Sequence, residues 1–282
     1  IIGFLKPLQN SQQIKKLAEN NIDAFSVELI PRISRAQSMD ALSSQSNLAG
    51  YKAVLNSVNE FSKAIPMMMT AAGTIAPAKI LILGAGVAGL QAIATAKRLG
   101  AIVSAFDVRT AVKEQVESLG AKFVEVTIDK QNETENETEG GYAKEMSEDY
   151  KLKQKELLED YVKKQDIIIT TALIPGKKAP ELISSSMVKE MKIGSIIMDL
   201  AAEAGGNCHF TKANETIIEN GIKILGPTDL PSQIPQDASN LYAKNLLNFI
   251  KLMVKDKQLK INWEDEILKK SCVSFEGKVI NI

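Results

Sequence analysis

A glycine-rich turn between an apolar run and a helical pattern constrains this chain more than any other feature. Residues 80–83 form a continuous apolar run typical of a strand buried on both faces, and Gly84, Gly86 and Gly89 follow it. A helical pattern then covers residues 87–99. In this arrangement the first glycine permits a tight turn, the second lets backbone amides approach a pyrophosphate, and the third lets the helix pack closely on the strand. The turn therefore predicts a dinucleotide bound at the amino end of the helix.

An acidic residue lies where such a site needs one. The next apolar run, residues 102–106, ends at Asp107. A carboxylate at this position accepts hydrogen bonds from ribose hydroxyls and repels a 2′-phosphate, which favours NAD(H) over NADP(H). Arg109 leaves an alternative open, because an arginine here could accommodate a phosphate, stack on adenine or face solvent. A glycine-rich bend without a ligand would explain the glycines but not the acid.

Strands and helices alternate from residue 79 onward, which predicts an α/β fold with a Rossmann-type, doubly wound parallel sheet. We assign residues 43–234 to this domain. The expected strands are residues 79–83, 102–106, 122–126, 166–171, 195–200 and 222–226, and the expected helices are residues 87–99, 110–119, 143–164 and 185–191. The polar stretch 129–141 has no apolar residue to anchor it, so we expect it to be mobile.

The two ends of the chain predict a second α/β lobe made of residues 1–42 and 235–282. Short strands at residues 2–5 and 24–27 flank a helix at residues 11–20, and a long helix follows Pro235. The chain opens in the middle of a pattern, so we expect this lobe to be truncated at its amino-terminal side. Ser38 is expected to cap a connecting helix that begins near Met39, and residues 66–77 are expected to form a loop bracketed by prolines.

Composition excludes several classes of function. The 34 basic residues balance the 34 acidic ones, so the chain has no electrostatic reason to bind nucleic acid. Cys208 and Cys272 lack the spacing of metal ligands, so we expect two reduced thiols and no metal site. The uncharged run 80–96 is interrupted by its glycines, and we expect no transmembrane helix.

The loops after the fourth and fifth strands should border the nicotinamide end of the cofactor. They contain Thr171, Leu173 and the pair Gly205-Gly206, although ordinary turn chemistry also explains the glycines. The only histidine, His209, lies in a loop and is expected to be exposed rather than catalytic. Hydride passing from one nicotinamide to another needs no general acid or base, so such a site would position rather than protonate.

Several segments together resemble the NAD(H)-binding domain I, or alpha subunit, of proton-translocating NAD(P) transhydrogenases. These segments are residues 31–40, 84–90, 105–109, 140–144 and 170–177. The resemblance implies direct hydride transfer between NADH and NADP+ bound on a partner domain. It implies that the nicotinamide end is held by Arg32, Gln37, Asp40 and Ser43. It assigns further cofactor contacts to Ile33, Ser34, Gly84, Gly86, Val87, Gly89, Asp107, Val108, Arg109, Gly141, Tyr142, Thr171 and Leu173, of which Gly141 and Tyr142 belong to a closing loop.

The same resemblance implies partners and a location. The expected partners are an NADP(H)-binding domain, a membrane proton-channel domain and a second copy of this chain in a homodimer. The expected location is a soluble domain peripheral to a membrane, on its cytoplasmic or mitochondrial-matrix side. The alternative is an alanine dehydrogenase-like enzyme, which would need a catalytic histidine in the first lobe that is not seen here; an NAD-binding sensor is a third possibility.

Overall fold

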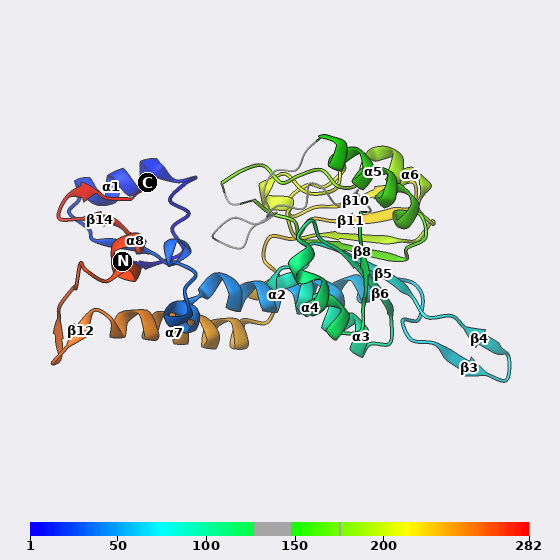
Figure 1. Cartoon of the computed structure of the whole chain (residues 1–282), viewed down its shortest axis with the longest axis horizontal. Helices are drawn as coiled ribbons and strands as arrows, with labels where there is room; N and C mark the ends of the chain where they lie inside the picture. Colours follow the sequence, from blue (N-terminus) through cyan, green and yellow to red (C-terminus); the bar gives the residue numbers. More distant parts are fainter. Residues whose placement is uncertain (127–147, 175, 282) are drawn as a thin grey trace. The chain divides into compact units, whose positions relative to one another are not determined.

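Two compact units make up this chain, and each is described by itself. The structure is a computed structural model that describes residues 1–126, 148–174 and 176–281. Residues 47–233 form one unit, and residues 1–46 together with 234–282 form the other. The larger unit holds the glycine-rich turn (Figure 1).

A seven-stranded sheet forms the centre of the larger unit. Its strands are β5 (Lys79–Leu83), β6 (Ile102–Phe106), β7 (Lys122–Val124), β8 (Ile167–Thr170), β9 (Ile196–Asp199), β10 (Thr216–Glu219) and β11 (Ile222–Leu225). They lie in the order β10-β11-β9-β8-β5-β6-β7, and only the β10–β11 pair is antiparallel. The direction in which strands are added reverses between β5 and β8. Ligands of such sheets bind beyond the carboxyl ends of the strands at this point.

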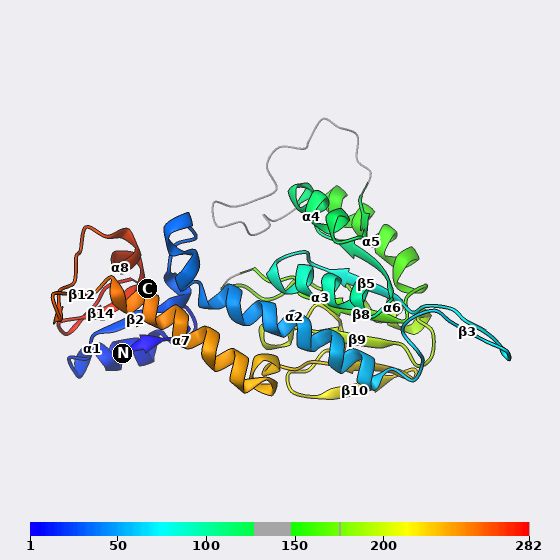
Figure 2. The same ribbon diagram turned by 90° about the horizontal axis from the view of Figure 1, so that it is seen from below.

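Helices cover both faces of this sheet, as the two views in Figures 1 and 2 show. On one face lie α3 (Val87–Arg98), α4 (Lys113–Ser118) and the part of α2 (Ala41–Glu60) that belongs to this unit, with Ile93 and Val116 packed near Ile80. On the other face lie α5 (Glu148–Val162) and α6 (Ser185–Glu190), where Leu158 joins the core cluster of Leu81. The sheet is thus doubly wound, and the predicted α/β Rossmann fold is confirmed.

The smaller unit has its own four-stranded sheet, in the order β1-β2-β14-β15. Its strands are β1 (Ile2–Gly3), β2 (Ala24–Ser26), β14 (Cys272–Phe275) and β15 (Lys278–Val279). Helix α1 (Ser11–Glu19) places Ile14 in a small cluster with Val273, while α7 (Pro235–Lys251) and α8 (Glu266–Ser271) pack Phe249 and neighbouring side chains around Phe25. A short hairpin of β12 (Val254–Lys255) and β13 (Gln258–Leu259) follows α7.

Several expected boundaries were wrong. The strand expected at residues 2–5 stops at Gly3, because Leu5 and Lys6 donate their backbone N–H groups to the carboxylate of Glu28, at 3.1 and 2.8 Å, instead of to a strand. The helix expected from Met39 begins at Ala41, since Asp40 rather than Ser38 accepts the hydrogen bond from the Ser43 N–H at its start.

Other elements were not foreseen. Residues 66–77 are not a plain loop but carry a hairpin of β3 (Met68–Thr70) and β4 (Gly73–Ile75), whose residues are all exposed. The antiparallel edge strand β10 was also missed, as were the small elements after α7. The β3–β4 and β12–β13 hairpins have only exposed residues, so their strands lack the alternation of apolar and polar residues by which strands are recognised in a sequence.

The structure also bears on two expected absences, within the residues it describes. No described helix is long and apolar enough to cross a membrane. No group of three or more potential metal ligands occurs in the described part of the chain.

Candidate dinucleotide-binding site

The three glycines after β5 differ sharply in their surroundings. Gly84 has a φ of +100°, and a Cβ there would lie 2.6 Å from Oγ1 of Thr171. A Cβ on Gly89 would lie 1.8 Å from the carbonyl oxygen of Gly84, so this glycine permits the contact between helix and turn. A Cβ on Gly86 would have no atom within 4 Å. The turn is therefore sterically closed at Gly84 and Gly89 and open at Gly86.

The amino end of α3 is available to an anion. Gly86 is the residue before the helix, and no side chain caps it. The first amides of a helix have no partner within the helix, and with the helix dipole they favour a negatively charged group such as a phosphate. The open space at Gly86 and the uncapped helix end fit a pyrophosphate.

The carboxylate of Asp107, which follows β6, is buried and accepts hydrogen bonds from four donors. Oδ2 accepts a hydrogen bond from the Ala85 N–H at 2.7 Å, which ties the end of β6 to the turn after β5. Arg109 supplies the other donors: its N–H and Nε lie 2.9 Å from Oδ1, and its Nη2 lies 2.9 Å from Oδ2. A carboxylate has about four lone-pair sites, so these four bonds fill them. Arg109 is thus the direct partner of Asp107.

Thr171 joins the strand ends on the two sides of the switch point. Its hydroxyl donates to the carbonyl oxygen of Gly84 at 2.9 Å, and its N–H donates to that of Leu83 at 2.8 Å. Leu173, two residues further along, is 43% exposed. Val87 at the start of α3 is also exposed, and Val108 is half-buried. The predicted residues of this unit that the structure describes therefore gather at the carboxyl ends of β5, β6 and β8.

The other predicted segment, residues 32–43, belongs to the smaller unit. It contains the 3-10 helix η2 (Ser34–Met39) and the start of α2. Asp40 accepts from the N–H of Ser43 at 2.8 Å and from its hydroxyl at 2.5 Å, which makes this pair the cap of α2. Arg32, Ser34 and Gln37 are exposed, and Ile33 is half-buried.

Helix α7 holds this segment within the smaller unit. Asn245, which is buried, donates to the carbonyl oxygen of Ser38 at 2.9 Å and accepts from the hydroxyl of Ser44 at 2.7 Å. Gly141 and Tyr142, predicted for the closing loop, lie outside the described residues, as does the whole stretch 129–141 that is expected to be mobile.

Two residues that sequence reasoning did not single out organise the loop after β9. The carboxylate of Asp199 is fully buried and accepts from the N–H groups of Ala201, Asn207 and Cys208 and from the hydroxyl of Thr211. The side chain of Asn207, also fully buried, bonds to the loop after β8. The one signal in the sequence was a polar residue directly after the Gly205-Gly206 pair. That pair has positive φ angles, as turn chemistry predicts.

The thiols and the histidine have no part in catalysis that the structure supports. Burial raises the pKa of Cys208 to about 12 and that of Cys272 to about 11, so neither thiol is a nucleophile at neutral pH. Both are free, as expected. The side chain of His209 is 50% exposed and lies 3.2 Å from Oε2 of Glu181, which agrees with its predicted exposure.

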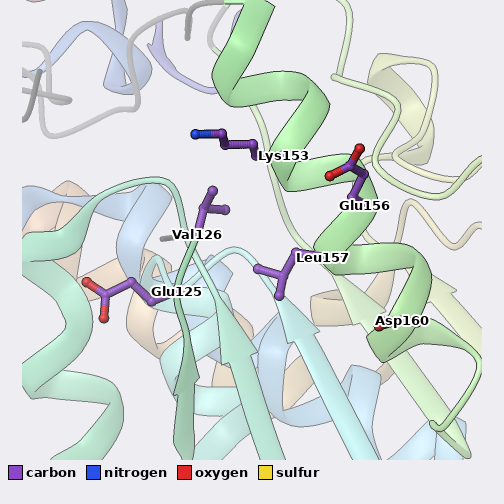
Figure 3. Close-up of a pocket in the computed structure, with 6 residues that line it drawn as sticks. All are labelled: Glu125, Val126, Lys153, Glu156, Leu157 and Asp160. Atoms are coloured by element: carbon purple, nitrogen blue, oxygen red, sulfur yellow. The ribbon is translucent and has the colours of Figure 1, made fainter. Parts of the chain in front are cut away.

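Two hollows lie on the larger unit. One, of about 340 Å³, lies between the end of β7 and α5 and is lined by three carboxylates and one lysine, and two of these carboxylates, Glu125 and Asp160, pair with Lys113 and Lys163 (Figure 3). It is lined by Glu125, Val126, Lys153, Glu156, Leu157 and Asp160. The other, of about 470 Å³, is a surface groove along α3 and α4.

Comparison with known proteins agrees with this geometry. The family models "Alanine dehydrogenase/PNT, C-terminal domain" and "Alanine dehydrogenase/PNT, N-terminal domain" match residues 53–282 and residues 1–49. The chain is 55% identical to a protein of Rhodospirillum rubrum named as the first portion of NAD(P) transhydrogenase subunit alpha, over all of this chain and 73% of that protein.

Solved structures give the same relationship. The crystal structure of transhydrogenase from Sinorhizobium meliloti matches 99% of this chain and 74% of its own with a TM-score of 0.88 at 47% identity. An L-alanine dehydrogenase also covers 99% of this chain, with a TM-score of 0.78 but only 22% identity, which shows a shared fold alone. The chain therefore belongs to the alanine dehydrogenase/PNT family, within which it is highly similar to the NAD(P) transhydrogenase alpha subunits.

Proposed function

We propose that this chain is the NAD(H)-binding component of a proton-translocating NAD(P) transhydrogenase, in which hydride passes directly between NADH here and NADP+ on a partner domain. One observation carries the cofactor assignment: the turn after β5 is sterically closed except at Gly86, where it meets the uncapped start of α3. The high identity to transhydrogenase alpha subunits supports the reaction.

The adenosine half fits against Asp107. Four donors already occupy the lone pairs of the Asp107 carboxylate. Ribose hydroxyls can therefore bind to this carboxylate only by replacing donors of the Arg109 guanidinium. The Ala85 N–H bond holds the carboxylate in place while that exchange occurs. Val87 and Val108 provide apolar contact beside it. The negative charge of Asp107 disfavours a 2′-phosphate, which supports NAD(H) in this chain and leaves NADP(H) to the partner.

For the nicotinamide half we propose the residues that the family resemblance implies. From the larger unit we propose Thr171 and Leu173, which follow the carboxyl end of β8, together with Gly141 and Tyr142. From the smaller unit we propose Arg32, Ile33, Ser34, Gln37, Asp40 and Ser43. Arg32 and Gln37 are exposed, and their side chains are of the kind that binds a carboxamide and a ribose.

In the proposed mechanism the chain positions and shields but moves no proton. NAD(H), when bound, supplies or receives the hydride. Arg32 and Gln37 orient the reactive ring, and Asp40 with Ser43 caps α2 directly after the segment that carries them. Because orientation dominates such a transfer, a misplacement of about 1 Å can lower the rate roughly 100-fold. The exposed, Glu181-paired His209 is not required.

The family also guides the proposed partners. We propose an NADP(H)-binding domain and a membrane proton-channel domain as partners, with this chain peripheral to the membrane on its cytoplasmic or mitochondrial-matrix side. We further propose a homodimer.

Nucleotide selectivity tests the assignment. Titration followed by nucleotide fluorescence should give much tighter binding of NADH than of NADPH. Asp107→Asn should lower the affinity for NADH at least tenfold and reduce the difference between the affinities for NADH and NADPH. Equal affinities in the wild-type protein would sink the assignment of Asp107. Oxidation of alanine with NAD+ by the chain alone would instead favour the alanine dehydrogenase alternative.

A further inference from the structure

The loop that follows β8 is bonded at both of its ends by one side chain. Nδ2 of Asn207 donates to the carbonyl oxygen of Ala172 at 2.9 Å and to that of Pro180 at 2.8 Å. Oδ1 of the same side chain accepts from the N–H of Ala172 at 3.1 Å. The two residues so joined lie at the beginning and the end of the loop between β8 and α6. Asn207 therefore determines where this loop leaves the sheet.

Asn207 is itself firmly held. Its N–H donates to Oδ2 of Asp199 at 2.7 Å, and its carbonyl oxygen accepts from the N–H groups of Leu182 and Ile183 at 2.8 and 2.9 Å. The carboxylate of Asp199, at the end of β9, is fully buried. Hydrogen bonds thus connect the end of β9, through Asn207, to the loop that follows the neighbouring strand β8.

This loop borders the glycine turn. Thr171, directly before Ala172, donates its hydroxyl to the carbonyl oxygen of Gly84. Both donor hydrogens of the Asn207 amide are used by protein carbonyls and the side chain is fully buried, so it does not contact a nucleotide itself. Any effect of Asn207 on the cofactor must pass through the loop.

We propose that Asn207 is a positioning residue that holds the loop after β8 in the conformation that receives the nicotinamide half of NAD(H). This inference rests on the proposed function. In the proposed function the adenosine half and the pyrophosphate lie at Asp107 and Gly86, and Asn207 forms its hydrogen bonds with Ala172, Pro180, Leu182, Ile183 and Asp199 instead. The residue should therefore matter to one half of the cofactor and not to the other.

The substitution Asn207→Asp separates positioning from packing. It keeps the shape of the side chain but places an acceptor against two carbonyl oxygens, so the loop must move. Affinities for NADH and for ADP, which contains only the adenosine half, are measured by calorimetry on the full chain. We expect NADH binding to weaken at least tenfold and ADP binding to change less than twofold. Asn207→Ala, which removes the bonds without repulsion, should give the same pattern more weakly.

A matched control lies at the amino end of β8. Gln165 precedes β8, is buried, and donates through Nε2 to the carbonyl oxygen of Tyr161 at 2.9 Å. Gln165→Glu makes the same chemical change and should lower the melting temperature without altering the ratio of NADH to ADP affinity. That result would show that lower stability alone does not change the ratio of the two affinities.

The outcomes distinguish this inference from the proposed function. If the wild-type chain binds NADH and the Asn207 variants weaken NADH and ADP equally, or neither, Asn207 has only a structural role and the inference is overturned. If Asn207→Asp does not fold, Asn207→Ala decides by the same ratio. If the wild-type chain does not bind NADH at all, the proposed function itself fails.

Discussion

Gly86 directly precedes α3 and Gly89 lies in its first turn, yet substitution should impair ligand binding at Gly86 and stability at Gly89. A Cβ on Gly89 meets the carbonyl oxygen of Gly84 at 1.8 Å, whereas a Cβ on Gly86 meets nothing within 4 Å. The backbone of Gly86, with φ −76° and ψ −166°, is one that any residue adopts. Gly89 is thus required by the fold, while Gly86 is required only by a ligand.

We predict that Gly86→Ala leaves the melting temperature within about 2 °C of wild type, since a surface change within about 0.5 kcal/mol moves it little in a chain of this size. NADH affinity should fall at least tenfold because the methyl group occupies the space for the pyrophosphate. Gly89→Ala should instead destabilise the protein by several kcal/mol. Thermal unfolding and NADH titration of both variants check this. A Gly86→Ala protein that binds NADH normally would contradict the placement of the pyrophosphate.

At this scale the sequence was sufficient for some residues and not for others. The glycines and Asp107 could be predicted because their spacing along one strand-turn-helix unit carries the chemistry. In the structure Arg109 pairs with Asp107, which was not among the alternatives considered for it and which no spacing rule could have chosen. Asn207 escaped notice because its partners, Ala172 and Pro180, lie far from it in the sequence.

Among the elements, η2 and α8 are joined by one ion pair. The guanidinium of Arg35 donates to both carboxylate oxygens of Asp265 at 2.8 and 2.9 Å, and Asp265 also caps α8 through the N–H of Ile267. The hydrogen bond from Arg35 lowers the pKa of the Asp265 carboxyl, outweighing the opposing effect of burial. The ion pair therefore links the segment that carries Gln37 to the carboxyl-terminal part of its unit.

A carboxyl whose pKa is lowered by folding stabilises the protein above its unfolded pKa of about 3.9, and the contribution is lost as pH falls through the lowered value. Asp265→Asn retains a good helix cap but loses the ion pair. We predict that it melts below wild type at pH 7 and at pH 5, and that the difference shrinks below about pH 4. Asp265→Ala should cost about 1 kcal/mol more because the cap is lost as well. A difference that persists unchanged at pH 3 would rule out the ion pair as its cause.

Secondary structure was predictable for the central elements of the larger unit, whereas the short buried elements α8 and β14 of the smaller unit were missed. The central strands and α3 were found because apolar runs and helical periodicity reflect burial in the sheet. The β3–β4 hairpin was missed because neither of its strands is buried. The start of α2 was misplaced by two residues because Ser38 and Asp40 are both good caps, and only the structure shows that Asp40 receives the bond.

For the whole molecule, the exposed β3–β4 hairpin is the surface most suited to a second copy. Met67, Met68, Met69 and Ile75 are all exposed there, with Met69 at 79%. Contiguous exposed apolar side chains of this kind mark association surfaces, and identical chains most often pair with twofold symmetry. Ile65 and Val54 are buried within the unit, whereas Met67, Met68 and Met69 are exposed.

We predict that Met68→Asp combined with Met69→Asp converts a dimer to a monomer without changing NADH affinity, since the hairpin precedes the amino end of β5 and the glycine turn follows its carboxyl end. Light scattering at micromolar concentration measures the mass. Thr74→Asp, on the facing strand, is a control for added charge alone. A wild-type chain that is monomeric under these conditions would refute the proposed role of the hairpin.

The central claim is that this chain supports direct hydride transfer from NADH to NADP+ on a partner domain and supplies no acid or base to that step. It is tested by following NADH labelled with deuterium at the transferring position of its ring, with NADP+ bound to an added NADP(H)-binding domain of a related transhydrogenase. The account predicts that NADPH forms with the label fully retained in ordinary water, and that Gly86→Ala lowers the rate at low NADH concentration. Loss of the label to water, or turnover that requires alanine and not the added domain, would contradict it.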